Sequence, residues 1–250
     1  MSTGGPVPGG PAAGRPGAGD PVRVVVVDYG AGNLVSIGQA LTAVGAEVRV
    51  ITGPAGLDGA DLLVVPGVGA AAPAMARLVA QGLVDPIRAW ASADRPFLGI
   101  CLGLQLLFDG SDEDGAETLG ILPGRTVRLD GAPTLPHIGW NQIVRRPAHL
   151  DHPAFAGIED GADLYFVHSY VGRPAPGHDD LVVAETTHGR AFASVVGRGR
   201  LLGVQFHPER SGTDGLRLLG NVVGAVGASR TGGSGRDERS APVPARVGVA

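Results

Sequence analysis

The chain has 250 residues, a net charge of −4 and a single cysteine. The acidic balance argues against a nucleic-acid-binding surface, and one cysteine cannot form an internal disulfide, which is typical of a cytosolic protein. The amino end lacks the apolar core of a signal peptide, and no apolar run approaches the ~20 residues of a membrane-spanning helix. We therefore expect a cytoplasmic protein with no membrane segment.

The two ends of the chain differ in composition from the middle. Residues 1–21 are almost all Gly, Pro and Ala, and residues 228–250 are mainly Gly, Arg, Ser, Pro and Ala. Such segments bury too little apolar surface to offset the entropy of ordering them. We predict disordered tails at 1–21 and 228–250, around one domain at 22–227.

The first half of this domain alternates strands with helices. The Val-rich run 22–30 is typical of a buried strand, and Asn33 can cap a helix that Gly45 ends. Further strands are predicted at 46–51, at 61–69 with a stop at Pro66 and Gly67, and at 96–100; helices are predicted at 73–92 with a break at Pro86, and at 102–109. This alternation predicts an α/β fold with a mostly parallel central sheet flanked by helices.

The second half is mostly strand. Strands are predicted at 125–129, 137–144, 164–171, 181–186, 191–197 and 200–206. With little helix between them, we expect mixed or antiparallel strands added to the sheet. The segment Ser211-Gly212-Thr213-Asp214 fits a capping box for a last helix that runs to about residue 225.

Cys101 occupies a distinctive turn. A lone cysteine in an apolar setting is usually core, but here Gly-x-Cys-x-Gly stands between a strand and a helix, as in a nucleophile elbow. Backbone N–H groups at a helix start favour a thiolate. Gln105 is four residues further on and shares a helix face with Cys101, so it faces either substrate or solvent.

A thiolate nucleophile needs a base and a group that orients it. The segment "GVQFHPER" (203–210) places His207 at the end of a strand, with Glu209 two residues later. If the chain stays extended, both side chains share a face, and the carboxylate can fix the imidazole tautomer. A surface turn is the alternative, and the cysteine elbow favours the Cys101-His207-Glu209 triad.

Acyl transfer also requires an oxyanion hole. The Gly-rich turn "PGVGA" (66–70) follows the third strand and leaves N–H groups free, and the Leu102 N–H follows the nucleophile directly. An ordinary strand-ending turn is the alternative for residues 66–70.

Other chemistries find less support. Gly30-Ala31-Gly32 follows a strand, but Val35 replaces the third glycine of a dinucleotide fingerprint, so we reject a nicotinamide site. No His, Cys, Asp or Glu cluster has metal-ligand spacing. We expect no metal or other cofactor, and we interpret 111–115 as a solvated acidic loop.

Three of these segments occur together in a known family. "GICLGLQLLF", "PGVGA" and "GVQFHPERS" resemble the class I (triad) glutamine amidotransferases, and the resemblance covers nearly all of 22–226. Within that class, "VDYGAGNL", "PHIGWNQI" and "YFVHSYV" are similar to the glutaminase subunits of imidazole glycerol phosphate synthases, which serve histidine biosynthesis.

The resemblance implies a role for each matching residue. Cys101 attacks the side-chain amide of L-glutamine, and His207, oriented by Glu209, protonates the departing ammonia. Val68 or Gly69, with Leu102, holds the oxyanion. Gln105 contacts the glutamine, and the backbone at His168, Ser169 and Tyr170 holds its α-amino and carboxylate end.

The resemblance also implies a heterodimer with a separate (βα)₈-barrel synthase subunit. The barrel receives the ammonia and converts a formimino ribotide to imidazole glycerol phosphate. Asn33 and Trp140 are expected at the subunit interface, with core packing as the alternative for Trp140. Arg210 stands where family members often have Lys; it keeps the charge but not the shape.

Two other functions remain open at this point. The chain could be the glutaminase of pyridoxal phosphate synthase, against which "DYGAGN" and "HIGWN" argue. It could also be a non-catalytic binding subunit on the same fold, against which the joint presence of Cys101, His207 and Glu209 argues.

Overall fold

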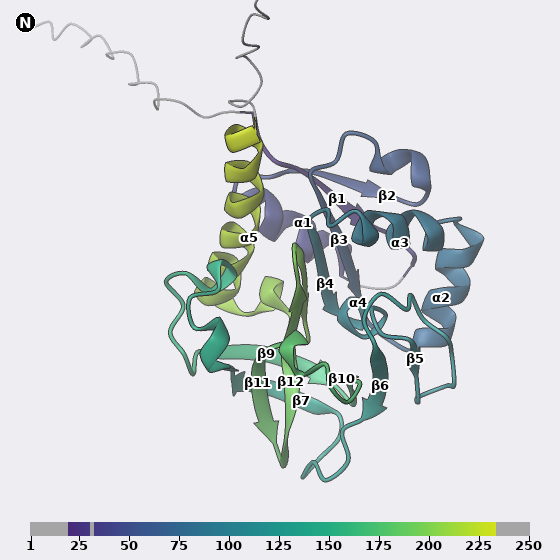
Figure 1. The fold of residues 1–250 in the computed structure, drawn as a ribbon, viewed down its shortest axis with the longest axis vertical. Helices are drawn as coiled ribbons and strands as arrows, with labels where there is room; N and C mark the ends of the chain where they lie inside the picture. Colours follow the sequence, from purple (N-terminus) through teal and green to yellow (C-terminus); the bar gives the residue numbers. More distant parts are fainter. Residues whose placement is uncertain (1–19, 31–32, 234–250) are drawn as a thin grey trace, which may run out of the picture.

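An eight-stranded mixed sheet forms the centre of the protein (Figure 1). The computed structural model describes residues 20–30 and 33–233. From one edge to the other, the strands are β2 (Glu47–Ile51), β1 (Arg23–Val27), β3 (Leu62–Gly67), β4 (Phe97–Cys101), β13 (Leu201–Val204), β12 (Arg190–Arg198), β11 (Val182–His188) and β8 (Val144–Arg145). From β2 to β13 the neighbours are parallel, and β12, β11 and β8 continue the sheet antiparallel.

Two small sheets complete the second half of the chain. One contains β10 (Tyr170–Pro174), β6 (Gly124–Arg128) and β5 (Gly110–Ser111), and the other pairs β7 (His137–Gln142) with β9 (Asp163–His168). The expected fold class is therefore confirmed: a mostly parallel α/β sheet to which mixed and antiparallel strands are added.

Helices cover both faces of the central sheet because its strands are apolar on both sides. The α-helices are α1 (Leu34–Ala43), α2 (Ala71–Ala80), α3 (Val84–Ser92), α4 (Leu102–Gln105) and α5 (Gly212–Gly233). Short 3₁₀ turns occur at η1 (Pro54–Leu57), η2 (Pro147–His149), η3 (Pro153–Phe155), η4 (Asp179–Leu181) and η5 (Pro208–Arg210). On β1, Val24 and Val26 pack in one core with α1 and α5, whereas Val25 and Val27 pack in a second core with α2 and α3.

The strand order brings two distant segments together. β13 pairs with β4 in parallel, with Val204 opposite Ile100, and β3 pairs with the other side of β4, with Gly67 opposite Cys101. Parallel strands end at a common edge of the sheet, and ligands of open α/β sheets bind at that edge. The ends of β3, β4 and β13 therefore meet at one place.

Several predicted boundaries in the first half are wrong. The 73–92 helix divides before Leu83 and not at Pro86, which lies in the first turn of α3, where a missing N–H is tolerated. The 102–109 helix is only the four residues of α4. β3 ends at Gly67, as predicted, and it accommodates Pro66 because β1 pairs with β3 only as far as Val64, so no N–H is needed there.

Boundaries in the second half also differ. The predicted strands 137–144 and 164–171 are each divided, at Ile143 and Ser169. Helix α5 continues to Gly233, past the domain limit predicted at residue 227. Ser211 directly precedes α5 as expected, but its Oγ accepts from the Tyr165 N–H and donates to the His207 carbonyl.

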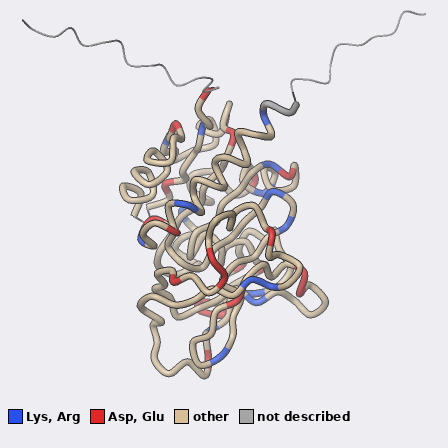
Figure 2. Tube along the Cα trace, turned by 90° about the vertical axis from the view of Figure 1, so that its left-hand side faces the viewer, with Lys and Arg blue, Asp and Glu red and all other residues tan. Residues whose placement is uncertain are grey.

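The surface carries both signs of charge. Figure 2 shows arginines and acidic residues interspersed along the trace. None of the helices within 20–30 and 33–233 combines the length and apolarity that a bilayer crossing requires. The tails predicted at 1–21 and 228–250 fall largely outside the described residues, at 1–19 and 234–250.

Candidate active site

Cys101 sits on a strained turn at the end of β4. Its φ of 52° and ψ of −106° are unusual for a residue other than glycine, and its side chain is 4% exposed. The flanking glycines allow this close approach. A Cβ on Gly99 would lie 2.7 Å from the Gly103 carbonyl, and a Cβ on Gly103 would collide with the Val65 carbonyl. The elbow geometry predicted from Gly-x-Cys-x-Gly is therefore present.

His207 and Glu209 form a buried pair after β13. Nδ1 of His207 lies 2.8 Å from Oε1 of Glu209, and the two side chains are 6% and 4% exposed. The extended backbone expected between them is wrong: Pro208–Arg210 forms the 3₁₀ turn η5, and this turn brings the carboxylate to the ring. The His207 N–H also donates to the Tyr165 carbonyl at 2.9 Å, which anchors the turn to β9.

The electrostatics of His207 favour the imidazolium. Burial lowers its pKa, but the Cys101 sulfur and the Glu209 carboxylate outweigh burial and raise it to about 10. Among the described residues, Nε2 of this ring has no hydrogen-bond partner. The imidazolium is therefore favoured, and Nε2 is the ring nitrogen available for proton exchange.

Two glutamines connect Cys101 to the wall of the site. Gln105 is 5% exposed, and its Nε2 donates to the Tyr170 carbonyl at 2.8 Å and to Oε1 of Gln205 at 3.3 Å. Gln205 in turn directs its Nε2 at the Cys101 Sγ, 3.6 Å away. The solvent-facing alternative for Gln105 is excluded. Sequence reasoning missed Gln205, although a polar residue in a buried apolar strand segment was a usable signal.

A cavity of about 320 Å³ opens beside Cys101. Its lining consists of Val68, Gly69, Ala70, Cys101, Leu102, Gln105, Glu113, Pro136, Val167, His168, Ser169 and Tyr170. The cavity gathers Cys101 with every residue that was predicted to hold the oxyanion or the substrate. A concave site of this size with few polar groups suits a small polar ligand.

Glu113 and Pro136 were not predicted in this lining. The 111–115 loop is not simply solvated, because the Asp114 carboxylate accepts from the Ala72 N–H at 2.6 Å and Asp112 pairs with Arg125 at 2.7 Å. Partial burial, with a smaller effect of Asp114, raises the pKa of Glu113. The loop is exposed, as predicted, at residues 112–115, but these contacts hold it in place and Glu113 lines the cavity.

Asn33 and Trp140 lie outside the cavity. Asn33 is exposed, and its Oδ1 caps α1 by accepting from the Ser36 N–H at 3.2 Å. Trp140 is 57% exposed, which excludes core packing, and its ring lies 6.1 Å from that of Tyr165. The Arg210 guanidinium lies 4.8 Å from the centre of the Tyr165 ring, so the charge at position 210 makes a cation–π contact.

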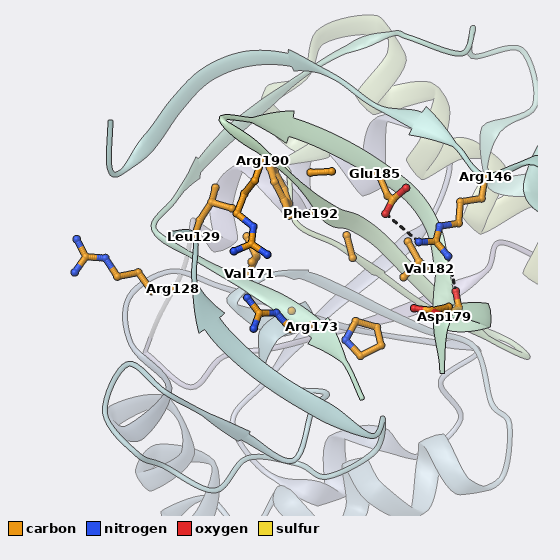
Figure 3. Close-up of a pocket in the computed structure, with 14 residues that line it drawn as sticks. Arg128, Leu129, Arg146, Val171, Arg173, Asp179, Val182, Glu185, Arg190 and Phe192 are labelled. Carbon is orange, nitrogen blue, oxygen red and sulfur yellow. Dashed lines mark hydrogen bonds and ion pairs between the residues drawn. The ribbon is translucent and has the colours of Figure 1, made fainter. Parts of the chain in front are cut away.

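A second cavity, of about 260 Å³, lies between β10 and β12 (Figure 3). Arg173 and Arg190 turn toward each other there, and Arg146 pairs with Glu185 at 3.0 Å. Within the part of the chain that the structure describes, no group of three or more His, Cys, Asp or Glu residues is arranged to hold a metal ion.

Comparison with known proteins identifies the family of this chain. Residues 25–223 match the family model of the class-I glutamine amidotransferases. The chain belongs to that family. The family resemblance stated from the motifs is thereby confirmed, and the chain is an enzyme of the glutaminase type.

Relatives define the branch within the family. The chain is 50% identical to the imidazole glycerol phosphate synthase subunit HisH of Symbiobacterium thermophilum, over 80% of this chain and 92% of that one. It is 47% identical to the HisH subunit of Synechococcus sp. (strain JA-3-3Ab), over 81% of this chain and 93% of that one. It is 46% identical to that of Chloroflexus aurantiacus, over 80% and 94%.

Solved structures share the fold at low identity. PurLQS from Thermotoga maritima matches with a TM-score of 0.64 and 21% identity, over 83% of this chain and 100% of that chain. The glutaminase domain of Trypanosoma brucei CTPS matches with a TM-score of 0.60 and 18% identity, over 83% and 94%.

Proposed function

We propose that this chain is the glutaminase subunit of imidazole glycerol phosphate synthase. The observation that carries the proposal is that Cys101 ends β4 beside a cavity of substrate size, while the buried His207–Glu209 pair follows β13, the strand that pairs with β4. The 46–50% identity to HisH subunits over about 80% of the chain supports the choice of branch.

The first half-reaction forms a thioester. The Cys101 thiolate attacks the amide carbon of L-glutamine, and the carbonyl oxygen becomes an oxyanion near the N–H groups of Val68 or Gly69 and Leu102. The C–N bond then breaks, and the His207 imidazolium donates its Nε2 proton to the leaving nitrogen, which departs as ammonia. The products are neutral imidazole and the γ-glutamyl thioester.

The second half-reaction returns the enzyme to its starting state. Neutral His207 accepts a proton from water as the hydroxyl adds to the thioester carbon. The C–S bond then breaks to give the Cys101 thiolate and the γ-carboxylic acid, which loses its proton to solvent as glutamate. Glu209 stabilises the imidazolium that forms again. We assign the α-amino and carboxylate end of the substrate to the segment His168, Ser169 and Tyr170, and the presence of these residues in the cavity wall supports that assignment.

The ammonia passes to a (βα)₈-barrel synthase subunit in a heterodimer. An exposed apolar surface on β7 supports a protein partner, since Ile138 and Trp140 are 61% and 57% exposed on one face of that strand. Asn33 and Trp140 are the proposed contacts.

The direct test is glutamate release from L-glutamine with and without the barrel subunit and its ribotide ligand. We expect release to be stimulated by the liganded barrel, and Cys101→Ala to abolish it in both conditions. Trp140→Ala is a useful comparison because it leaves the cavity intact and weakens only the response to the barrel. Stimulated release that survives Cys101→Ala would refute the mechanism, and stimulation only by a pyridoxal-phosphate-forming barrel would refute the choice of branch.

A further inference from the structure

A chain of polar side chains runs behind the cavity wall, in the β7–β9 ribbon. His137 and His168 are register partners at one end of this ribbon, and they are only 3% and 6% exposed. Nδ1 of His137 lies 3.1 Å from Nε2 of His168, and Asn141 reaches Nε2 of His137 at 3.2 Å. Neither His137 nor Asn141 lines the cavity, so the mechanism leaves both without a role.

The orientation of the Asn141 amide sets the direction of these hydrogen bonds. Its Nδ2 donates to the Thr187 carbonyl at 3.0 Å, and its Oδ1 accepts from the Gln142 N–H at 2.8 Å. Both contacts require the same amide orientation. The Asn141 nitrogen can therefore only donate to His137, and Nε2 of His137 must accept.

The tautomer of each ring then follows. His137 carries its proton on Nδ1 and donates to Nε2 of His168. His168 accepts there, carries its own proton on Nδ1, and donates to the Tyr170 carbonyl at 3.1 Å. Each residue in the series Asn141, His137 and His168 therefore donates to the next, and the last bond is accepted by the Tyr170 carbonyl.

The surroundings keep both rings neutral. The His137 ring stacks between the rings of Phe166 and His188, with centroid distances of 5.1 Å and 4.0 Å. The centroids of the Phe192 and His168 rings are 5.1 Å apart. Phe192 also lines the cavity of Figure 3. Burial, with the neighbouring histidines acting in the same direction, lowers the pKa of His137 to about 4 and that of His168 to about 3. A neutral imidazole has one donor and one acceptor, as this chain of bonds requires.

The chain of bonds ends on a carbonyl that matters for the site. Tyr170 O accepts from His168 and also from Nε2 of Gln105 at 2.8 Å. Two donors on one carbonyl leave its peptide little freedom to rotate. His168, Ser169 and Tyr170 all line the cavity, so the bonds fix the shape of its wall.

Alternate residues of β7 serve opposite faces. His137 and Asn141 point into the hydrogen-bond chain, whereas Ile138 and Trp140, one position along, are exposed. The strand that carries the proposed partner surface is therefore the strand that holds the cavity wall from behind.

We propose that Asn141 and His137 are positioning residues for glutamine binding, which act by a one-way hydrogen-bond relay that holds His168 in its Nδ1–H form and fixes the Tyr170 carbonyl. The expected effect on glutamine binding rests on the proposed function, whereas the tautomers assigned to His137 and His168 do not depend on it. A failure of either can therefore be recognised separately.

The first test is ¹⁵N NMR of the histidine rings of the full chain, without substrate or partner. We expect His137 and His168 both to show a protonated Nδ1 and an unprotonated Nε2 at neutral pH, with Asn141→Leu releasing His137 into a mixture of tautomers. His178, which is exposed and has no hydrogen bond to either ring, provides an assignment reference in the same spectrum. An Nε2–H form of His168 in the native chain would overturn the proposal.

The second test compares two variants of His137 in the complex with the barrel subunit. His137→Asn keeps a donor at the Nδ1 position, whereas His137→Phe keeps an aromatic ring and removes the donor. We expect His137→Phe to raise KM for glutamine about tenfold with kcat changed less than about twofold, and His137→Asn to restore most of the loss. Equal defects in the two variants, or a native KM in His137→Phe, would overturn the relay. If His137→Phe does not fold, the NMR result on the native chain still decides.

Discussion

Nδ1 of His207 lies 2.8 Å from Oε1 of Glu209, and the two side chains are buried together. Because this bond occupies one ring nitrogen, Nε2 is the nitrogen left for proton exchange, and it has no other partner among the described residues. The carboxylate also helps to raise the pKa of the ring. This pair therefore sets both the orientation and the charge of the proposed acid–base group.

Glu209→Gln tests that relationship. The amide keeps the shape of the side chain but cannot stabilise an imidazolium, and it allows the wrong tautomer. We expect kcat of the stimulated glutaminase to fall roughly 100- to 10,000-fold, with little change in KM. The matched control is Glu47→Gln, at an exposed position of the edge strand β2. Activity within about threefold of the native level in Glu209→Gln would exclude an orienting role.

The pH dependence of stability should report the charge on His207. Its folded pKa of about 10 lies above the unfolded value of ~6.5. The folded state therefore binds the proton more tightly, and the resulting stabilisation is fully present below pH ~6.5 and is lost as pH rises toward 10. We expect the free energy of unfolding to fall across this window by an amount on the order of a few kcal/mol.

Urea denaturation of the native chain and of His207→Gln across the same window measures this effect. The variant should lack the His207-dependent slope, and His178→Gln, at an exposed histidine, should retain it. Parallel slopes in the native chain and in His207→Gln would contradict a raised pKa.

Gly103→Ala tests the packing that permits the Cys101 turn. A Cβ on Gly103 would collide with the Val65 carbonyl, so α4 would have to move away from β3. We expect the free energy of unfolding, measured by thermal unfolding, to fall by about 1–3 kcal/mol or more. Glutaminase activity should be lost as well.

The matched control is Gly38→Ala in α1, where nothing lies within 4 Å of the added carbon. Alanine is a better helix former than glycine, so the free energy of unfolding of this variant should rise by about 0.5–1 kcal/mol. A Gly103→Ala variant as stable as the native chain would mean that the close approach is not required.

Trp140→Ala tests the proposed partner surface. An exposed aromatic ring beside Tyr165 is suited to a binding hot spot, so we expect Kd for the barrel subunit to rise about 30-fold or more. Stability and the unstimulated glutaminase rate should remain native. Val79→Ala, also at an exposed apolar position but on α2, should leave Kd unchanged. Calorimetric titration with the barrel subunit makes the measurement, and a native Kd in Trp140→Ala would place the interface elsewhere.

Local patterns in the sequence determined much of this protein. The Val-rich runs and the helical spacings between them specified an α/β sheet, because each pattern reflects which faces of a short segment are buried. The glycines around Cys101 predicted a tight strand-to-helix turn, although the contact that excludes a Cβ at Gly103, with the Val65 carbonyl of β3, exists only in the folded chain. The helix cap at Asn33 was also visible, because it depends on neighbours only three residues away.

The tertiary structure decided what those local patterns could not. The adjacency of β13 and β4 brings His207 to Cys101 across more than one hundred residues of chain, and no local signal specifies which strands pair. The same holds for Gln205, which became part of the site only through its distance to the Cys101 sulfur, and for Glu113 in the cavity lining. The roles of His137 and Asn141 depend on which nitrogen faces which oxygen, and only folded geometry fixes that direction.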